Sequence, residues 1–215
     1  MMRCSVVALA VLGLVMTTVS SEAQSPRRQG APVDLLDAMA TGRVEAVFYG
    51  NGDESVRGRI RRSAFGPQEV TVSPGTQFWA QQDGLQGMTT LGWVPIDLTR
   101  TAIAYVEIPT ACTNYDLPAP TRFDRMDPVC CPDRRMAVVS EYVGKTQPPR
   151  PVAQLAVWAV ANNPEWSEVV GWAESRALAD DEQERAEQVA SYRQGAANLL
   201  LTAGFDPAGF RMFRE

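Results

Sequence analysis

Three cysteines lie close together in the middle of this 215-residue chain, at positions 112, 130 and 131. Outside the cytoplasm thiols are usually paired, so we predict a disulfide that joins Cys112 to Cys130 or to Cys131. Such a bridge closes a loop of roughly 18 residues and stabilises the fold by about 3 kcal/mol. One cysteine is then left over. We favour a buried, inert thiol for it over an intermolecular bridge or a reactive thiol.

The chain contains no histidine, and this removes several kinds of catalytic site. Serine and cysteine triads need an imidazole base, and metalloprotease sites need imidazole ligands. Three thiolates without a fourth ligand also make a poor zinc site. The nucleophile elbow, the phosphate-binding loop and the dinucleotide fingerprint are absent from the sequence as well. We therefore assign no catalytic residue, no cofactor and no metal from the sequence.

Acidic residues are the remaining source of acid–base chemistry. A glycosidase needs two carboxyl groups roughly 5–10 Å apart across a cleft. The spacing along the chain does not indicate such a pair, so a carboxylate-based hydrolase is an alternative that rests on composition alone. The candidates are Asp97, Glu107, Asp116, Asp124 and Asp127.

Residues 154–158 read Gln-Leu-Ala-Val-Trp, within a segment expected to be helical. This segment resembles the Gln-x-Ala-(Ile/Val)-Trp motif of bacterial thioester domains. In that family a glutamine on a helix condenses with a cysteine on a neighbouring β-element, and the thioester captures amines on a host surface. The resemblance implies that Gln154 is the acyl donor and Cys112 the thiol, or Cys130 or Cys131 if Cys112 is bridged.

The thioester family also joins a β-sandwich to a helical part, and its members are exported with the cysteine upstream of the glutamine. A simpler interpretation of the same segment needs no chemistry. It is an amphipathic helix that places Leu155, Val157 and Trp158 partly in the core.

The N-terminus has the three parts of a secretory signal peptide. Arg3 gives a positive start, residues 5–19 form an uncharged apolar run, and the small residues Ser21 and Ala23 precede a cut before Gln24. The apolar run of about 15 residues is shorter than the roughly 20 that a transmembrane helix needs. We predict that residues 1–23 are removed. The mature chain is then expected to be a secreted or periplasmic protein of a bacterial type. We expect no membrane span in the mature chain.

The formal net charge is −5. Nucleic-acid binders need clustered positive charge, so we expect no nucleic-acid partner. One basic run, Arg57, Arg59, Arg61 and Arg62, is more typical of a solvated strand edge than of an anion site.

Two subdomains are expected after the signal peptide and a linker over residues 24–41, which contains a short docking helix over 33–39. Residues 42–132 form a β-rich subdomain, because apolar and polar residues alternate and turn signals recur roughly every 8–12 residues. This predicts a small antiparallel β-sandwich or barrel. The cysteines are expected in an irregular loop over 110–132, which follows the last strand.

Residues 133–215 have the periodicity of a helical subdomain. Asp133 and Gly144 are expected to bound its first helix, and Asp180 or Asp181 to start its longest. The predicted fold class is therefore α+β, with an N-terminal β-sandwich or barrel followed by a C-terminal helical part, after a cleaved signal peptide.

We predict from these features a non-catalytic binding or structural module whose partner is an extracytoplasmic protein or a glycan. Exposed tryptophans would favour a glycan, because an indole face packs on the apolar faces of sugar rings, although burial in the core is more typical of this residue. The five tryptophans are Trp79, Trp93, Trp158, Trp166 and Trp172.

Overall fold

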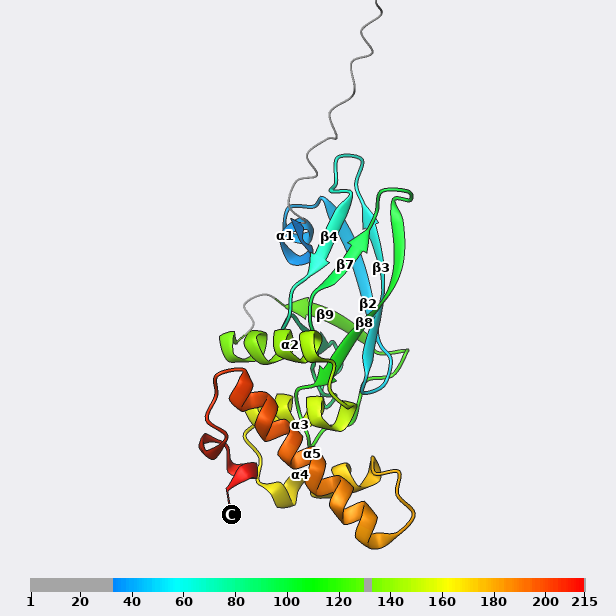
Figure 1. Cartoon of the computed structure of the whole chain (residues 1–215). Helices are drawn as coiled ribbons and strands as arrows, with labels where there is room; N and C mark the ends of the chain where they lie inside the picture. The colour runs from blue at the N-terminus through cyan, green and yellow to red at the C-terminus, as the bar shows by residue number, and fades with distance from the viewer. Residues whose placement is uncertain (1–32, 130–132, 215) are drawn as a thin grey trace, which may run out of the picture. The chain divides into compact units, whose positions relative to one another are not determined.

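The computed structural model of this chain describes residues 33–129 and 133–214. The signal peptide predicted over residues 1–23, the linker up to residue 32, and both Cys130 and Cys131 lie outside the described residues. In the described part a β-barrel precedes a group of helices along the chain, so the mixed α+β class is confirmed (Figure 1).

Six antiparallel strands close into a barrel in the order β2-β3-β8-β6-β5-β9. Their side chains alternate between the inside and the outside, as in β2, where Val44 and Phe48 are buried and Glu45 and Tyr49 are exposed. Closure leaves no free edge in this sheet. The strands are β2 (Val44–Gly50), β3 (Ser55–Arg62), β5 (Gln77–Ala80), β6 (Met88–Thr90), β8 (Ile103–Cys112) and β9 (Arg125–Val129).

The barrel interior is packed with apolar side chains. Phe48 and Phe78 meet edge to face with ring centroids 5.0 Å apart. Gly58 lies opposite Phe48 on β3, and a Cβ atom there would come within 2.4 Å of the Phe48 ring. The Phe48 ring therefore needs glycine at this position. Other fully buried side chains of the barrel are Ile60, Met88, Ile108 and Met126.

A second, three-stranded sheet and a short helix complete the N-terminal part. The sheet has the order β1-β4-β7, and its β1–β4 pair is parallel. The side chain of Asp34 accepts a hydrogen bond of 2.8 Å from Leu36 N and so caps α1, which buries Leu35 and Ala38. These elements are β1 (Val33–Asp34), α1 (Leu35–Ala40), β4 (Glu69–Val72) and β7 (Val94–Asp97).

The strands depart from the sequence pattern in two places. Residues 88–96, whose apolar and β-branched side chains favour a single strand, form β6 and β7 in different sheets, and Gly92 between them has a φ of +78°. The region 110–132 is not wholly irregular, because β8 continues to Cys112 and β9 closes the barrel. β9 has few β-branched residues and contains Pro128, so its sequence did not indicate a strand.

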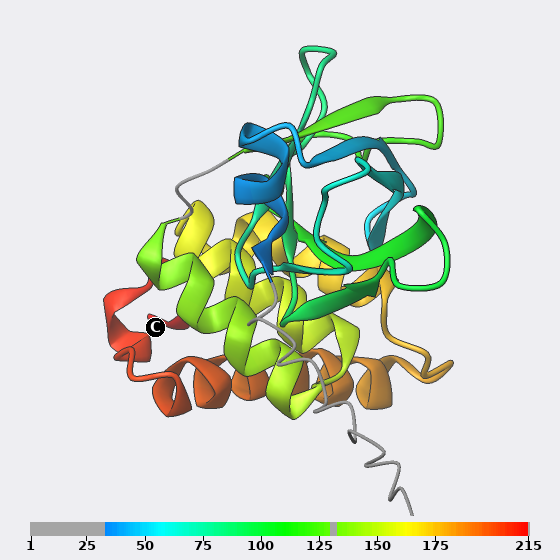
Figure 2. The same ribbon diagram turned by 90° about the horizontal axis from the view of Figure 1, so that it is seen from above.

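Four helices follow the barrel, and α3 lies at their centre. It contacts α2, α5 and strand β8, and Figure 2 shows it between the strands and α5. All residues from 152 to 160 of this helix are buried. The helices are α2 (Arg134–Thr146), α3 (Arg150–Ala161), α4 (Trp166–Ser175) and α5 (Glu182–Thr202), and two 3-10 turns follow, Pro207–Gly209 and Arg211–Phe213.

The helix ends agree only in part with the sequence pattern. Asp133 and Asp181 act as the expected N-caps. The expected stop at Gly144 is wrong, since α2 continues to Thr146 and ends at Gln147, which is left-handed with a φ of 46°. Gly144 instead allows a close approach between α2 and the β6–β7 connection: a Cβ atom on it would lie 2.3 Å from the Cα of Gly92.

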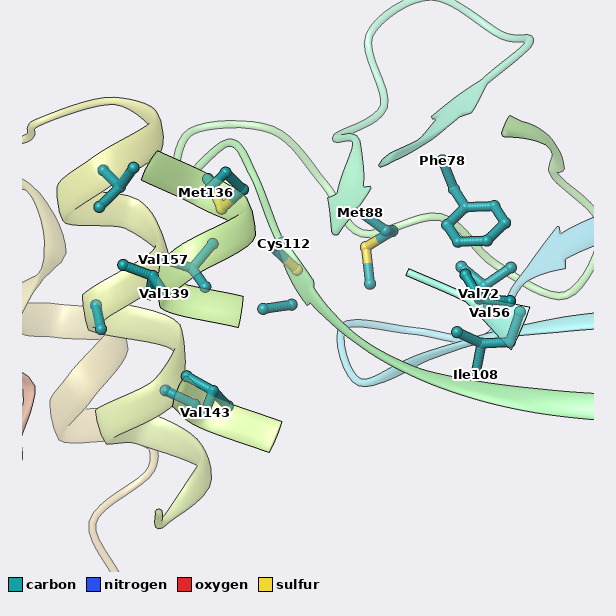
Figure 3. Close-up of a cluster of buried hydrophobic side chains, with 14 of the residues drawn as sticks. Val56, Val72, Phe78, Met88, Ile108, Cys112, Met136, Val139, Val143 and Val157 are labelled. Carbon is teal, nitrogen blue, oxygen red and sulfur yellow. The ribbon is translucent and has the colours of Figure 1, made fainter. Parts of the chain in front are cut away.

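One hydrophobic cluster extends from the barrel into the helices. Figure 3 shows Met88 and Ile108 on the barrel side and Val139 and Val157 on the helical side, with Cys112 between them. The two predicted subdomains therefore share a core, and Cys112 lies where they meet.

Candidate functional site

Cys112 is the last residue of β8, at a point where β8 pairs with only one neighbouring strand. On one side Cys112 still pairs with Met88 of β6. On the other side the β3–β8 pairing ends at Ser55 and Pro109. The backbone groups of Cys112 on that side therefore need partners from outside the sheet, since buried N–H and C=O groups are rarely left unpaired.

Gln154 of α3 supplies both partners. The N–H of Cys112 donates to Gln154 Oε1 at 3.0 Å, and Gln154 Nε2 donates to the Cys112 carbonyl at 2.8 Å. Gln154 is only 1% exposed and Cys112 only 2%. The carboxamide thus takes the place of the missing strand, and it is held against the backbone of the cysteine that the sequence resemblance paired with it.

The sequence of α3 explains how a glutamine reaches this position. Its flanking residues Ala153, Leu155 and Ala156 are buried, and the two small alanines allow α3 to lie close to its neighbours. The motif tryptophan, Trp158, is 3% exposed and meets Trp172 edge to face at 4.7 Å. The expectation that the apolar residues of this helix belong to the core is therefore confirmed, and the polar Gln154 lies within the same buried run.

Among the described residues the Cys112 thiol has no disulfide partner, and it points to the turn between β2 and β3, where its Sγ donates to the Asp53 carbonyl at 3.6 Å. Burial raises the pKa of this thiol from 9.0 to about 12, against the opposing effect of the Arg150 charge. The thiol is thus protonated at neutral pH. The predicted disulfide partners Cys130 and Cys131 lie outside the described residues, so the disulfide stays a prediction.

Two arginines of the helical part hold the Asp53 turn over the thiol. The Arg150 guanidinium donates to the carbonyls of Asp53 and Thr110, and Arg176 at the end of α4 pairs with the Asp53 carboxylate. Burial lowers the pKa of Arg150, but a guanidinium stays charged in proteins. Its Nε is buried and has no hydrogen-bond partner within the described residues. Arg150 is therefore a cation held beside the thiol by backbone carbonyls.

We expect the thiol to react slowly with alkylating agents, because burial raises its pKa to about 12 and leaves little of it as the reactive thiolate. Iodoacetamide at pH 8 should modify Cys112 at least about a hundred-fold more slowly in folded Gln154→Ala protein than in urea. Arg150→Gln should slow the reaction further, and Arg150→Lys should not. Peptide mass spectrometry separates Cys112 from the other cysteines, and equal rates for folded and unfolded protein would contradict the assignment.

Four of the five candidate carboxylates are held by hydrogen bonds or ion pairs to other described residues. Hydrogen bonds from Thr99 and Thr121 lower the pKa values of Asp97 and Asp124, whereas a general acid needs a raised one. Glu107 bonds to Ser55 and Arg57, and Asp127 accepts from Gln81. Asp116 makes no side-chain hydrogen bond or ion pair to the described residues. Among those residues no group of three or more acidic or thiol side chains could hold a metal ion.

The tryptophans divide between core and surface. Trp158 is buried and Trp166 and Trp172 are half-buried, while Trp79 on β5 and Trp93 before β7 are 59% and 58% exposed. Two tryptophans, Trp79 and Trp93, are therefore exposed, as the hypothesis of a glycan-binding surface requires.

Sequence reasoning missed Asp53, Arg150 and Arg176. Arg150 stands in the segment Gln147–Pro151, whose three prolines indicate only a break between helices. Its contact with Asp53 joins residues that are 97 positions apart in the chain, and no local sequence pattern predicts a contact across such a separation.

No helix in the described part of the chain is both long and apolar enough to cross a membrane. Comparison of the chain with protein-family models, with curated proteins and with solved structures finds no significant match.

Proposed function

We propose that this chain is an exported binding module that attaches to its partner covalently, through a thioester between Cys112 and Gln154. The observation that carries this proposal is the double hydrogen bond between the Gln154 carboxamide and the Cys112 backbone. The resemblance of residues 154–158 to thioester domains names the same two residues. As in that family, a β-rich part is joined to a helical part, here as a closed barrel instead of a sandwich. The signal-peptide pattern of residues 1–23 supports a place outside the cytoplasm.

Formation of the thioester needs one rearrangement and one leaving group. The Cys112 side chain turns from the Asp53 carbonyl toward Gln154, and Sγ attacks the carboxamide carbon Cδ. A C–S bond forms and the C–N bond breaks, and the amide nitrogen leaves as ammonia with the thiol proton. The Cys112 N–H already donates to Oε1, so it stabilises the negative charge that develops on this oxygen.

Capture of a partner reverses the role of the sulfur. A primary amine on the partner attacks the thioester carbon, a C–N bond forms, and the C–S bond breaks. The sulfur leaves and takes up the proton of the amine, so the product is an amide between Gln154 and the partner. Because burial disfavours the thiolate, the sulfur leaves together with a proton, which the attacking amine supplies.

The same geometry also has a purely structural explanation. The carboxamide satisfies two buried backbone groups, and this alone stabilises the end of β8. A non-catalytic binding module that uses its exposed tryptophans would need no more than that, and its sequence would be equally compatible with export. The two possibilities differ in one property, which is the reactivity of Gln154 toward amines.

Incubation of the folded mature protein with methylamine tests the proposal. We expect the peptide that contains Gln154 to carry a methylamide in place of its carboxamide, and Cys112 to become available as a thiol. Cys112→Ala is the matched control and should show no methylamide. A native protein that incorporates no more methylamine at Gln154 than this control would contradict the proposal and leave the structural explanation.

A further inference from the structure

A polar groove with an exposed tryptophan lies between the barrel and the helices. Its volume is about 420 Å³, within the range of small-molecule sites. Strand β5, the β5–β6 loop, the segment after β8 and the ends of α2 and α3 all contribute to its walls. Its aromatic and polar lining includes Trp79, Gln82, Asp83, Asn114, Arg135 and Asn162.

Trp79 is fixed in place and yet open to solvent. It stands on β5 opposite Asp127 of β9, on the outer face of the barrel. Its indole N–H donates to Gln77 Oε1 at 2.9 Å, so the polar edge of the ring is already satisfied within the protein. The ring is nevertheless 59% exposed. The groove therefore contains a large aromatic surface in a fixed orientation, and much of its apolar area is exposed to solvent.

The polar side chains around Trp79 keep hydrogen-bonding capacity to spare. Within the described residues, the side chains of Gln82 and Asn162 make no hydrogen bond. Asn114 uses its Oδ1 to accept from Gly87 N and Thr113 Oγ1, which leaves its amide nitrogen to donate. Arg135 is paired with Asp133 and so adds little net charge to the groove. The groove thus offers the carboxamides of Gln82 and Asn162, which can donate and accept. It also offers the Asn114 amide nitrogen, which can donate, and the Asp83 carboxylate, which can accept.

We propose that this groove binds a neutral oligosaccharide. A sugar ring offers a C–H face that is weakly positive and packs against the negative face of an indole, and a rim of hydroxyl groups that carboxamides recognise. An apolar ligand would cover these amides and leave them without hydrogen-bond partners, which disfavours its binding. A nucleic acid would need free positive charge, and the groove arginine is neutralised by Asp133.

This site is distinct from the proposed thioester, although the two are close in the chain. Thr113, which lines the groove, directly follows Cys112. The noncovalent site depends on neither Cys112 nor Gln154, so it is tested independently of the covalent chemistry.

The full mature protein can be titrated with neutral oligosaccharides of the glucan, xylan, mannan and chitin types, with intrinsic tryptophan fluorescence and calorimetry as readouts. We expect at least one probe to bind. Trp79→Ala should weaken that probe at least tenfold and Trp79→Phe less, while Asn162→Ala should weaken it a few-fold.

Trp93 provides the matched control, because it is 58% exposed and lies outside this groove. Trp93→Ala should retain the binding that Trp79→Ala loses, and both variants should keep the native unfolding temperature because both rings are largely exposed. Failure of every probe to bind would overturn the proposal. Equal affinity of native and Trp79→Ala protein, or a loss that follows Trp93, would overturn it as well.

Discussion

In a Cys112→Ala background, which keeps the Gln154 carboxamide, replacement of Gln154 by alanine should lower the free energy of unfolding by about 2–5 kcal/mol. The change leaves the backbone N–H and carbonyl at position 112 buried without partners, at about 1–3 kcal/mol each, and opens a cavity where the carboxamide lay. Few glutamines in a protein of this size should matter as much, because most lie on the surface. Urea unfolding followed by circular dichroism measures the difference.

Gln194 is a suitable control for this change. It lies on α5 and bonds only to Asn198 on the exposed face of the same helix, so Gln194→Ala in the same background should change the stability by less than about 0.5 kcal/mol. Gln154→Glu should be as harmful as alanine, because it removes the donor to the Cys112 carbonyl and buries a charge. A Gln154→Ala protein as stable as the Gln194→Ala protein would show that the carboxamide does not support β8.

Substitution of Gly144 by alanine should lower the stability by about 1–3 kcal/mol, although alanine is normally the better residue inside a helix. The added methyl group would lie 2.3 Å from the Cα and 2.9 Å from the N of Gly92. Both are backbone atoms, so neither can move aside easily. Gly92 itself has a φ of +78°, which ties the connection between β6 and β7 to this conformation.

Gly171 of α4 provides the opposite case within the same protein. It also lies inside a helix, but no atom approaches the position of its missing Cβ within 4 Å. Gly171→Ala should therefore raise the stability by about 0.5–1 kcal/mol through the lower entropy of the unfolded chain. Thermal unfolding of the two variants should give shifts of opposite sign. A stabilising Gly144→Ala would mean that α2 does not pack against Gly92.

The local patterns of the sequence were sufficient for most of the elements. Alternation in β2 and the capping residues Asp133 and Asp181 act over a few residues, and that strand and those helix starts are where the pattern places them. Gly144 shows the limit of such rules. A glycine near the end of a periodic segment indicates a helix stop, but a tertiary contact with Gly92 decided its role instead.

The site was predictable to a similar extent. The resemblance named Cys112 and Gln154, because a glutamine within an otherwise apolar helix is visible in five consecutive residues. Asp53, Arg150 and Arg176 were not predictable, since they come from three separate segments and meet only in the folded chain. The Trp79 groove was foreseen only as a requirement for an exposed tryptophan.

The intact mass of the reduced mature protein tests the thioester most directly. Native protein should be lighter by one ammonia than its sequence requires, and Cys112→Ala should have the mass that its sequence requires. A native protein whose mass equals that of its sequence, under native conditions and before any exposure to amines, would contradict a thioester between Cys112 and Gln154.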